Sequence, residues 1–293
     1  MGTISFIPNQ KDLATFQSRF QAYLSPSKNP HIQAFYRLDG ATASLYKSGK
    51  FLLQGTKAEE YAGLLGQEVT ASSQIDQTSL SIMGSDEVGN GSYFGGLAVV
   101  SALVRPQDID WLKSLGVGDS KQINDRTIRR LAPLLKEKLP HQALLLGPAK
   151  YNQVIASGYN AVSVKVALHN QAHFLLQERG YQADRILIDA FTSEQNYKRY
   201  LKNESNHFPQ EVILEEKAEG EYLAVAAASI LARDLFLTNL EELSLQIGYD
   251  LPSGAGSPSD KVAAQILKTY GMEGLNQVAK LHFKNTEKAK KLM

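Results

Sequence analysis

The feature that most constrains this fold is the wholly apolar run Ile186-Leu187-Ile188, which lies between two long helical patterns. A short run without polar residues is typical of a strand buried on both faces of a sheet. Strand and helix patterns alternate over this part of the chain, which predicts an α/β domain. The strands are expected at 80–84, 93–104, 142–146 and 185–188, and the helices at 123–138, 161–179, 222–243 and after 258.

The first 68 residues follow a different pattern and predict a small α+β domain. Asp39-Gly40 and Ser48-Gly49-Lys50 are typical hairpin turns, so the strands on either side of them should pair as an antiparallel sheet with helices on one face. Residues 67–78 are polar and aperiodic, and we expect a linker over 69–79 and a second domain over 80–293. In the first domain we expect strands at 4–7, 34–38, 41–46 and 51–54, and helices at 12–24 and 57–65.

The chain contains 31 lysines and arginines, 30 aspartates and glutamates, and no cysteine. The lack of cysteine excludes a disulfide scaffold, a cysteine zinc site and a thiol nucleophile. We find no apolar run near the ~18–20 residues that span a bilayer, and no charged start of a signal peptide. We therefore expect a cytoplasmic protein that does not contact a membrane.

The nearly neutral total charge conceals a strong segregation along the chain. Residues 1–57 hold seven basic and two acidic side chains, residues 280–293 hold five and one, and the middle holds 19 and 27. Basic ends favour the phosphates of a nucleic acid. The aromatic residues among the first basic side chains have two open interpretations, as stacking platforms for bases or as core. These residues are Phe20, Tyr23, Tyr36, Tyr46 and Phe51.

Four acidic residues lie among apolar residues or glycines. Asp86 and Glu87 follow the predicted strand 80–84, Asp189 ends the apolar run, and Glu219 precedes an alanine-rich helix. An ionised carboxylate in such surroundings costs several kcal/mol unless it is paired or binds a metal. Several carboxylates at strand ends are the ligands of two-metal phosphodiester hydrolysis, and their oxygens suit Mg²⁺ or Mn²⁺.

Structural interpretations of the same acids remain open at this point. Asp189 has the position of a residue that caps the next helix, and Glu219 that of an acid favoured by a helix dipole. Asp86 and Glu87 are adjacent, and adjacent strand residues point to opposite faces. They share a site only if the chain bends, as the following Gly89-Asn90-Gly91 permits.

Three rival motifs fail on inspection. The glycine spacing of Gly84 and Gly89 matches a P-loop, but the required lysine is replaced by Asn90. A dinucleotide-binding loop lacks its third glycine in this segment. His169 and His173 share a helix face but lack the glutamate of a zinc protease motif, so a hydrogen-bonded or solvated helix face is the better interpretation. We therefore expect no organic cofactor.

The segment Gly84-Ser85-Asp86-Glu87-Val88-Gly89-Asn90-Gly91-Ser92-Tyr93-Phe94-Gly95 resembles the first active-site motif of bacterial ribonuclease HIII, a branch of the type 2 ribonucleases H. The resemblance runs from about residue 80 to near the C-terminus. The N-terminal unit agrees, because this family carries a small domain similar to half of the TATA-binding protein. Three further blocks match in order: Gly118-Asp119-Ser120-Lys121, Tyr159-Asn160 with Leu168-His169-Asn170-Gln171-Ala172, and Lys217-Ala218-Glu219-Gly220 with Ala226-Ala227-Ala228-Ser229-Ile230.

The resemblance implies a ribonuclease H-like domain, with a central mixed sheet flanked by helices, that hydrolyses the RNA strand of RNA–DNA hybrids. It implies cleavage to 5′-phosphate and 3′-hydroxyl ends with two Mg²⁺ or Mn²⁺ ions, by a monomer. The metal-binding and catalytic acids of the family fall on Asp86, Glu87, Asp189 and Glu219. Its substrate-binding residues fall on Gly89, Asn90 and Gly91, which would read the ribose 2′-hydroxyl, and on Ser120 and Lys121 at a phosphate.

Two other functions remain in competition. One is a nuclease or resolvase of the same fold that cuts DNA, which the loop Gly89-Asn90-Gly91 disfavours. The other is a hybrid-binding module without catalysis, which the presence of all four acids disfavours. Hydrolysis of the RNA strand is therefore the leading hypothesis.

Overall fold

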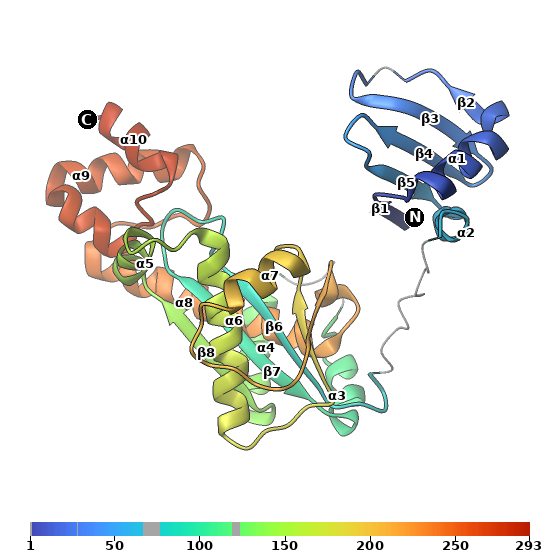
Figure 1. Ribbon diagram of the computed structural model, residues 1–293. Coiled ribbons are helices and arrows are strands. Elements are labelled where there is room, and N and C mark those ends of the chain that lie inside the picture. Colours follow the sequence, from blue (N-terminus) through green and yellow to red (C-terminus); the bar gives the residue numbers. More distant parts are fainter. Residues whose placement is uncertain (1, 28, 67–76, 119–123) are drawn as a thin grey trace. The chain divides into compact units, whose positions relative to one another are not determined.

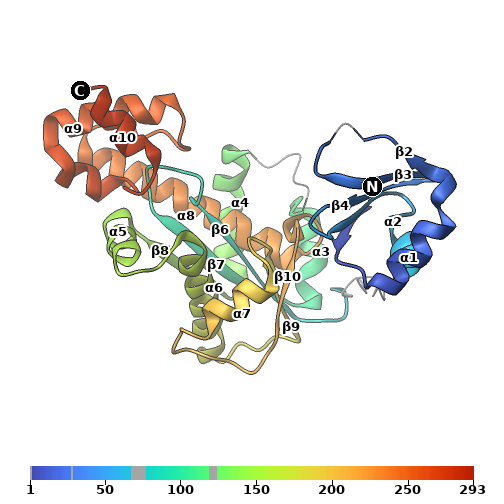
Figure 2. The same cartoon turned by 45° about the horizontal axis from the view of Figure 1, so that its top comes forward.

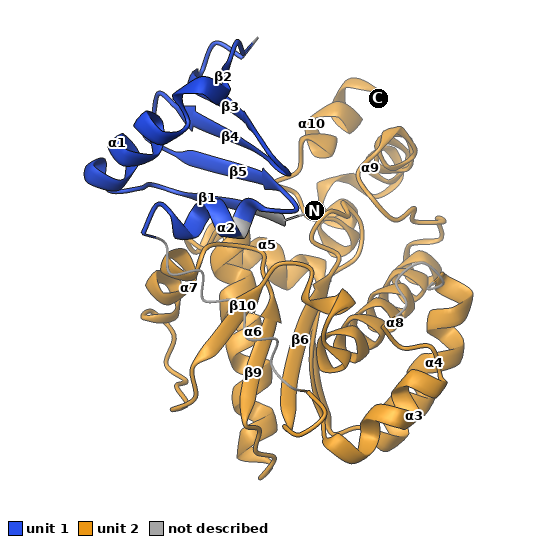
Figure 3. Cartoon of the chain, turned by 90° about the vertical axis from the view of Figure 1, so that its right-hand side faces the viewer, with its two compact units in different colours: residues 1–76 blue, residues 77–293 orange. Residues whose placement is uncertain are grey.

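The computed structural model of the protein describes residues 2–27, 29–66, 77–118 and 124–293. The chain divides into two compact units, residues 1–76 and residues 77–293 (Figure 3). The predicted domain limits of 1–68 and 80–293 stay a prediction, because most of the expected linker over 69–79 lies outside the described residues.

The described residues of unit 1 form a five-stranded antiparallel sheet in the order β1-β5-β4-β3-β2, with two helices. The helix expected over 12–24 ends earlier, at Arg19, because Phe20 leaves the helical conformation with φ −107°. A single 3₁₀ turn and the short strand β2 follow it. The strands are β1 (Gly2–Phe6), β2 (Leu24–Ser25), β3 (Ile32–Leu38), β4 (Ala41–Tyr46) and β5 (Phe51–Gly55), and the helices are α1 (Gln10–Arg19) and α2 (Ala58–Gly63).

The aromatic residues of unit 1 mostly form its core. Phe16 of α1 packs edge-on against Tyr36 and Phe51, with ring centroids 5.8 and 5.2 Å away. All three side chains are buried. Tyr23 differs, because 47% of its surface is exposed. The core interpretation is therefore correct for Tyr36 and Phe51, and Tyr23 stays available to a ligand.

Unit 2 is built on a mixed five-stranded sheet in the order β10-β9-β6-β7-β8. β10, β9 and β6 run parallel, whereas β7 is antiparallel to both β6 and β8. The expected strand over 80–84 was placed too early: β6 continues through Asp86 and Glu87, so these acids belong to the strand. The bounds are β6 (Ile82–Val88), β7 (Leu97–Val104), β8 (His141–Leu146), β9 (Arg185–Asp189) and β10 (Val212–Glu215), the last of which the sequence did not reveal.

Helices cover both faces of this sheet (Figure 1). α6 packs on one face, against β6, β7 and β8, while α8 packs on the other with α4 beside it. Near the far end of α8, α9 and α10 pack together (Figure 2). The helices are α3 (Ile109–Ser114), α4 (Asp125–Lys138), α5 (Pro148–Ala156), α6 (Ala161–Glu178), α7 (Glu194–Leu201), α8 (Leu223–Ile247), α9 (Ser257–Val278) and α10 (Lys284–Lys291).

α8 is the central helix of unit 2. By length and composition alone it could span a membrane, contrary to the expectation that no segment would. However, 72% of its most apolar window is buried inside the unit. Its first turns are rich in alanine, and small side chains allow a strand to approach closely. The composition of α8 therefore reflects its place in the core.

Candidate active site

The strand β6 presents alternate side chains to the two helices that cover it. Gly84 lies against the backbone of α8, and two residues later Asp86 accepts a hydrogen bond from Ser229 of the same helix. Ser85 and Glu87 instead bond to side chains of α6. Since successive strand residues point to opposite faces, Asp86 and Glu87 leave β6 on different sides of the sheet.

Asp189 lies beside Asp86. In the parallel pair of strands β6 and β9, Ser85 lies opposite Ile188. The next residues along the two strands, Asp86 and Asp189, are therefore neighbours across the sheet. In-register neighbours point to the same face of a sheet. The backbone N–H of Ala218 donates to Oδ1 of Asp189 at 2.9 Å. This bond ties the end of β9 to the segment that carries the fourth acid.

Glu219 belongs to a 3₁₀ turn, Ala218–Gly220, that precedes α8. Lys217 enters this turn in the left-handed conformation, with φ 61°. Atom Oε2 of Glu219 is buried and has no hydrogen-bond partner. A buried carboxylate oxygen without a partner is costly, which indicates that its partner is a group outside the chain.

The acids on the α8 face perturb one another. Burial raises the pKa of Asp86 to about 7; the hydrogen bond from Ser229 opposes this rise, and the charges of Glu87 and Glu219 add to it. The pKa of Asp189 is raised to about 6, mainly by burial, and the neighbouring Glu219 and Asp86 contribute to this rise. Both carboxyls are therefore reluctant to ionise unless a cation compensates them.

Glu87 has an opposite environment on the α6 face. Lys165 Nζ donates to its Oε1 at 2.8 Å, and His169 Nε2 lies 3.0 Å from its Oε2. Burial alone would raise the pKa of Glu87, but His169 and Lys165 together hold it below its ordinary value. Glu87 is therefore kept ionised by the protein itself.

The four acids have the oxygen ligands of a divalent cation site, but their side chains are not arranged around one common point. Across the described residues, no three histidine, aspartate or glutamate side chains are arranged to hold a metal ion as they stand. Glu87 faces α6, whereas on the other face Asp189 and Glu219 lie close enough to share a hydrogen bond. The donor set is hard oxygen, and the buried Glu219 Oε2 lacks a partner, so the residues fit Mg²⁺ or Mn²⁺.

The loop after β6 carries the glycines expected to face the substrate. Gly89 has φ +104°, and a Cβ there would lie 2.4 Å from the carbonyl oxygen of Gly96. Gly91 has nothing within 4 Å of the same point, so its surroundings are open. Asn90 between them is exposed. Two further expected substrate residues, Ser120 and Lys121, lie outside the described residues.

Residues near the C-terminus bind residues 93–96, which follow this loop. Tyr93 N–H donates to the carbonyl of Gly254 at 3.0 Å, and the fully buried Lys280 donates through Nζ to the carbonyls of Gly95 and Gly96. Burial lowers the pKa of Lys280 to about 7. Lys280 is therefore a structural side chain, and it does not belong to the basic surface expected over 280–293.

Sequence reasoning missed Lys165 and the use of the two histidines. Lys165, His169 and His173 follow one another at four-residue spacing in α6, and all three are buried. The hydrogen-bonded interpretation of the histidines is confirmed, and the solvated one is wrong. The signal that could have revealed them is the four-residue spacing of these three polar side chains, which places them on one face of α6.

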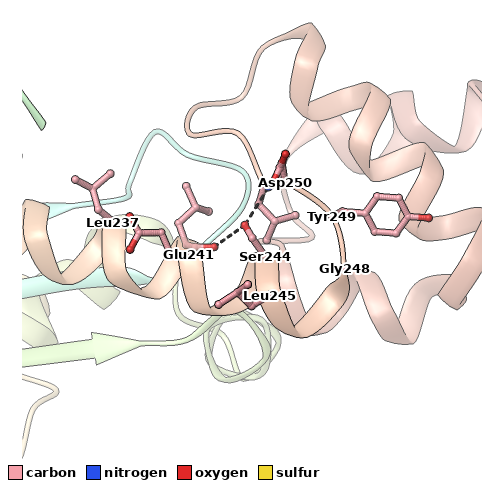
Figure 4. A pocket seen from close by; sticks show the side chains of 9 residues that line it. Leu237, Glu241, Ser244, Leu245, Gly248, Tyr249 and Asp250 are labelled. Carbon is pink, nitrogen blue, oxygen red and sulfur yellow. Dashed lines mark hydrogen bonds between the residues drawn. The ribbon is translucent and has the colours of Figure 1, made fainter.

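A separate hollow of about 750 Å³ lies at the end of α8 (Figure 4). Leucines line it together with polar residues, and one of these leucines, Leu245, is 84% exposed. It contains none of the four acids, and Ser244 Oγ in its wall donates to the carbonyl of Leu240 within α8. The chemistry of the acids therefore lies elsewhere in the unit.

Comparisons with known proteins agree with this geometry. A family described as Ribonuclease HII matches residues 83–286, and a domain of unknown function (DUF3378) matches residues 5–78. Ribonuclease HIII of Streptococcus pneumoniae (strain Taiwan19F-14) is 60% identical over 99% of both chains.

Solved structures show the same architecture. The crystal structure of Bst-RNase HIII in complex with Mn²⁺ superposes with a TM-score of 0.73 at 35% identity, over 99% of both chains. The ribonuclease H2 of Pyrococcus horikoshii OT3, at 23% identity and a TM-score of 0.62 over 72% of this chain and 98% of its own, shares the fold. The expected ribonuclease H-like mixed sheet with a separate N-terminal domain is thereby confirmed. The chain therefore belongs to the ribonuclease HII family of type 2 ribonucleases H, and within it to the ribonucleases HIII, which cleave RNA in RNA–DNA hybrids.

Proposed function

We propose that this protein hydrolyses the RNA strand of RNA–DNA hybrids with two divalent cations, Mg²⁺ or Mn²⁺, bound by Asp86, Glu87, Asp189 and Glu219. The products would carry 5′-phosphate and 3′-hydroxyl ends, as the family resemblance implies. The observation that carries this proposal is the group of interacting acids on the α8 face. Among the described ion pairs none neutralises Asp86, Asp189 or Glu219.

The electrostatics of the site supports cation binding. The raised pKa values of Asp86 and Asp189 mean that, without a cation, these carboxyls keep their protons to a higher pH than an ordinary aspartate does. A cation that displaces those protons removes the repulsion among the carboxylates, and its affinity rises with pH. The relative Bst-RNase HIII was crystallised in complex with Mn²⁺, an ion with the same ligand preference.

The residues of the site would have different roles in hydrolysis. When bound, the cations supply an activated water and stabilise the leaving oxygen. Asp86, Asp189 and Glu219 supply negative oxygens from one face of the sheet, and Glu87 supplies an ionised carboxylate fixed by α6. Gly89 sets the turn after β6, and the open space at Gly91 allows the ribose 2′-hydroxyl to approach the backbone. Lys121 would hold a phosphate.

The hybrid duplex is the proposed partner, and the protein would act on it as a monomer. Unit 1 carries the excess of basic residues over 1–57, and these would supply sequence-independent attraction to phosphates. The exposed ring of Tyr23 adds a surface on which a base or sugar can pack.

The variant Asp189→Asn tests the assigned site. It removes one negative charge with little change in shape, so cleavage of an end-labelled hybrid with Mg²⁺ or Mn²⁺ should fall below detection while hybrid binding stays measurable. Asp110→Asn, at an exposed position on α3, is the matched control and should cut normally. Retained cleavage by Asp189→Asn would reject the assigned site.

The substrate is tested with two further duplexes. An all-DNA duplex should remain intact, because it lacks the 2′-hydroxyl that the loop would read. A duplex with a single ribonucleotide shows whether one sugar suffices. Cleavage of the all-DNA duplex at a rate similar to that of the hybrid would instead identify a DNA nuclease of this fold.

A further inference from the structure

A line of buried polar side chains extends behind Glu87 into the sheet. Ser85 and Ser101 are cross-strand partners on β6 and β7, and both are fully buried on the α6 face. His169 and His173 of α6 are fully buried as well. Together with Glu87 these side chains form one continuous row, in the order Ser101, His173, Ser85, His169 and Glu87.

Each neighbouring pair in the row lies at hydrogen-bond distance. Ser101 Oγ is 2.8 Å from His173 Nδ1, and His173 Nε2 is 2.9 Å from Ser85 Oγ. Ser85 Oγ is 2.7 Å from His169 Nδ1, and His169 Nε2 is 3.0 Å from Glu87 Oε2. Both nitrogens of each imidazole are therefore engaged, which fixes the orientation of both rings.

The donor and the acceptor of each hydrogen bond in this row follow from the chemistry of its end at Glu87. The ionised carboxylate of Glu87 can only accept, so His169 must donate from Nε2. In a neutral imidazole the other nitrogen then accepts, so Ser85 donates its hydroxyl proton to Nδ1 of His169. Because Ser85 has used its proton, His173 donates to it from Nε2, and Ser101 donates to Nδ1 of His173.

The side chains around the row are buried, and Lys165 donates to Glu87 from the same face of α6. Burial lowers the pKa of His173 to about 3, so its imidazole is neutral near pH 7. Phe191 stacks on the ring of His169 at 5.1 Å and lies 4.1 Å from Lys165 Nζ, which adds an apolar wall.

We propose that Ser101, His173, Ser85 and His169 are positioning residues that hold the Glu87 carboxylate in one orientation for cation binding. Lys165 and His169 each occupy one lone pair of Glu87, on different oxygens, and the remaining lone pairs stay free for a cation. This inference rests on the proposed role of Glu87 as a ligand. Hydrogen bonds that orient a ligating carboxylate commonly change metal affinity or activity by about 10- to 100-fold when removed.

The tautomers give a direct test on the unaltered protein. Imidazole ¹⁵N spectra of the intact chain at neutral pH should show a proton on Nε2 and none on Nδ1, for both His169 and His173. A proton on Nδ1 of His173 would reverse the direction of the row and overturn the proposal. This test does not depend on how any variant folds.

Variants at the far end of the row test its effect on the cation. Ser101→Ala and His173→Leu should each weaken Mn²⁺ binding, measured by calorimetry, by about 10-fold or more. His173→Gln retains one acceptor and one donor and should stay within about 3-fold of the unaltered protein. Ser163→Ala, which removes a buried hydroxyl from the first turn of the same helix, should bind Mn²⁺ normally.

Cleavage kinetics and the variant Glu87→Gln distinguish failure of the positioning role from failure of the proposed function. Ser101→Ala should need more Mn²⁺ for half-maximal cleavage while KM for the hybrid stays unchanged, because Ser101 acts only through Glu87. If Glu87→Gln leaves Mn²⁺ binding unchanged, the proposed function is wrong at Glu87. If Glu87→Gln weakens Mn²⁺ binding but Ser101→Ala and His173→Leu do not, only the positioning role is rejected.

Discussion

Gly84 of β6 lies directly against Ala224 of α8: a Cβ built on the glycine would come within 2.5 Å of the carbonyl carbon of Ala224. Two residues further along β6, Asp86 accepts a hydrogen bond from Ser229 of the same helix. The absent side chain at Gly84 therefore sets the distance between the strand and the helix that flank the acidic site.

Gly84→Ala should destabilise unit 2 strongly. The added methyl meets backbone atoms of Ala224 and Val225, which cannot turn away as a flexible side chain would, and overpacking of this kind costs about 3 kcal/mol. Gly147→Ala, where a Cβ meets nothing within 4 Å, is the control and should cost less than about 1 kcal/mol. Urea unfolding measures both, and equal costs would contradict the close contact.

Gly91→Ala should separate substrate contact from folding. A Cβ at Gly91 has no neighbour within 4 Å in the protein, so the free energy of unfolding should change by less than about 0.5 kcal/mol. If the hybrid backbone approaches this glycine, the methyl obstructs it, and kcat/KM should fall about 10-fold, equivalent to ~1.4 kcal/mol. Gly89→Ala, which clashes with Gly96 and Phe236, should instead lower stability. Unchanged cleavage by Gly91→Ala would remove this loop from the substrate site.

The cation-free protein should lose stability as pH rises from about 5 to about 8. The pKa values of Asp86 and Asp189 are raised on folding, so the folded state holds more protons than the unfolded state above pH 4, and this contribution disappears as pH rises through about 6 and about 7. Glu87 has a lowered pKa and titrates below this range.

Asp86→Asn isolates that effect. The advantage of the unaltered protein over Asp86→Asn in Tm should shrink across the same pH range without cation, and added Mn²⁺ should raise Tm more at pH 8 than at pH 5, because the cation binds the ionised carboxylates. A difference in Tm independent of pH would show that Asp86 does not titrate there.

Lys165→Met should lower the free energy of unfolding, because it breaks a buried ion pair. Lys165 and Glu87 have side chains only 6% and 10% exposed, and removal of one member of a buried ion pair leaves the other charge unpaired, at about 3–5 kcal/mol. The double variant Lys165→Met/Glu87→Gln should recover much of this loss. A double-mutant cycle in urea unfolding measures the coupling, and a value near zero would show that the pair is not formed in solution.

The sequence predicted the alternation of unit 2 well, because its buried strands and long helices carry strong periodic patterns. The strand β10 was missed, since four half-buried residues show too little contrast between faces. The end of β6 was placed too early, because Asp86 and Glu87 are unusual strand residues that their partners on two helices make acceptable.

The site, too, could be predicted only in part from the sequence. The four acids could be selected because ionised side chains among apolar residues need an explanation. The sequence could not show that Glu87 faces α6, nor that Ser101 belongs to a row leading to it, since β7 is apolar on both sides of that serine. Contacts between residues 72 positions apart, such as Ser101 and His173, exist only in the folded chain.

The most direct test of the account is the location of bound cation in crystals of the full chain. The anomalous difference map of crystals grown with Mn²⁺ and a non-cleaved hybrid should show peaks bounded by Asp86, Glu87, Asp189 and Glu219, at the ends of β6 and β9. Asp189→Asn crystals prepared in the same way should lose at least one peak. Peaks away from these four acids, or peaks unchanged in the variant, would contradict the assignment.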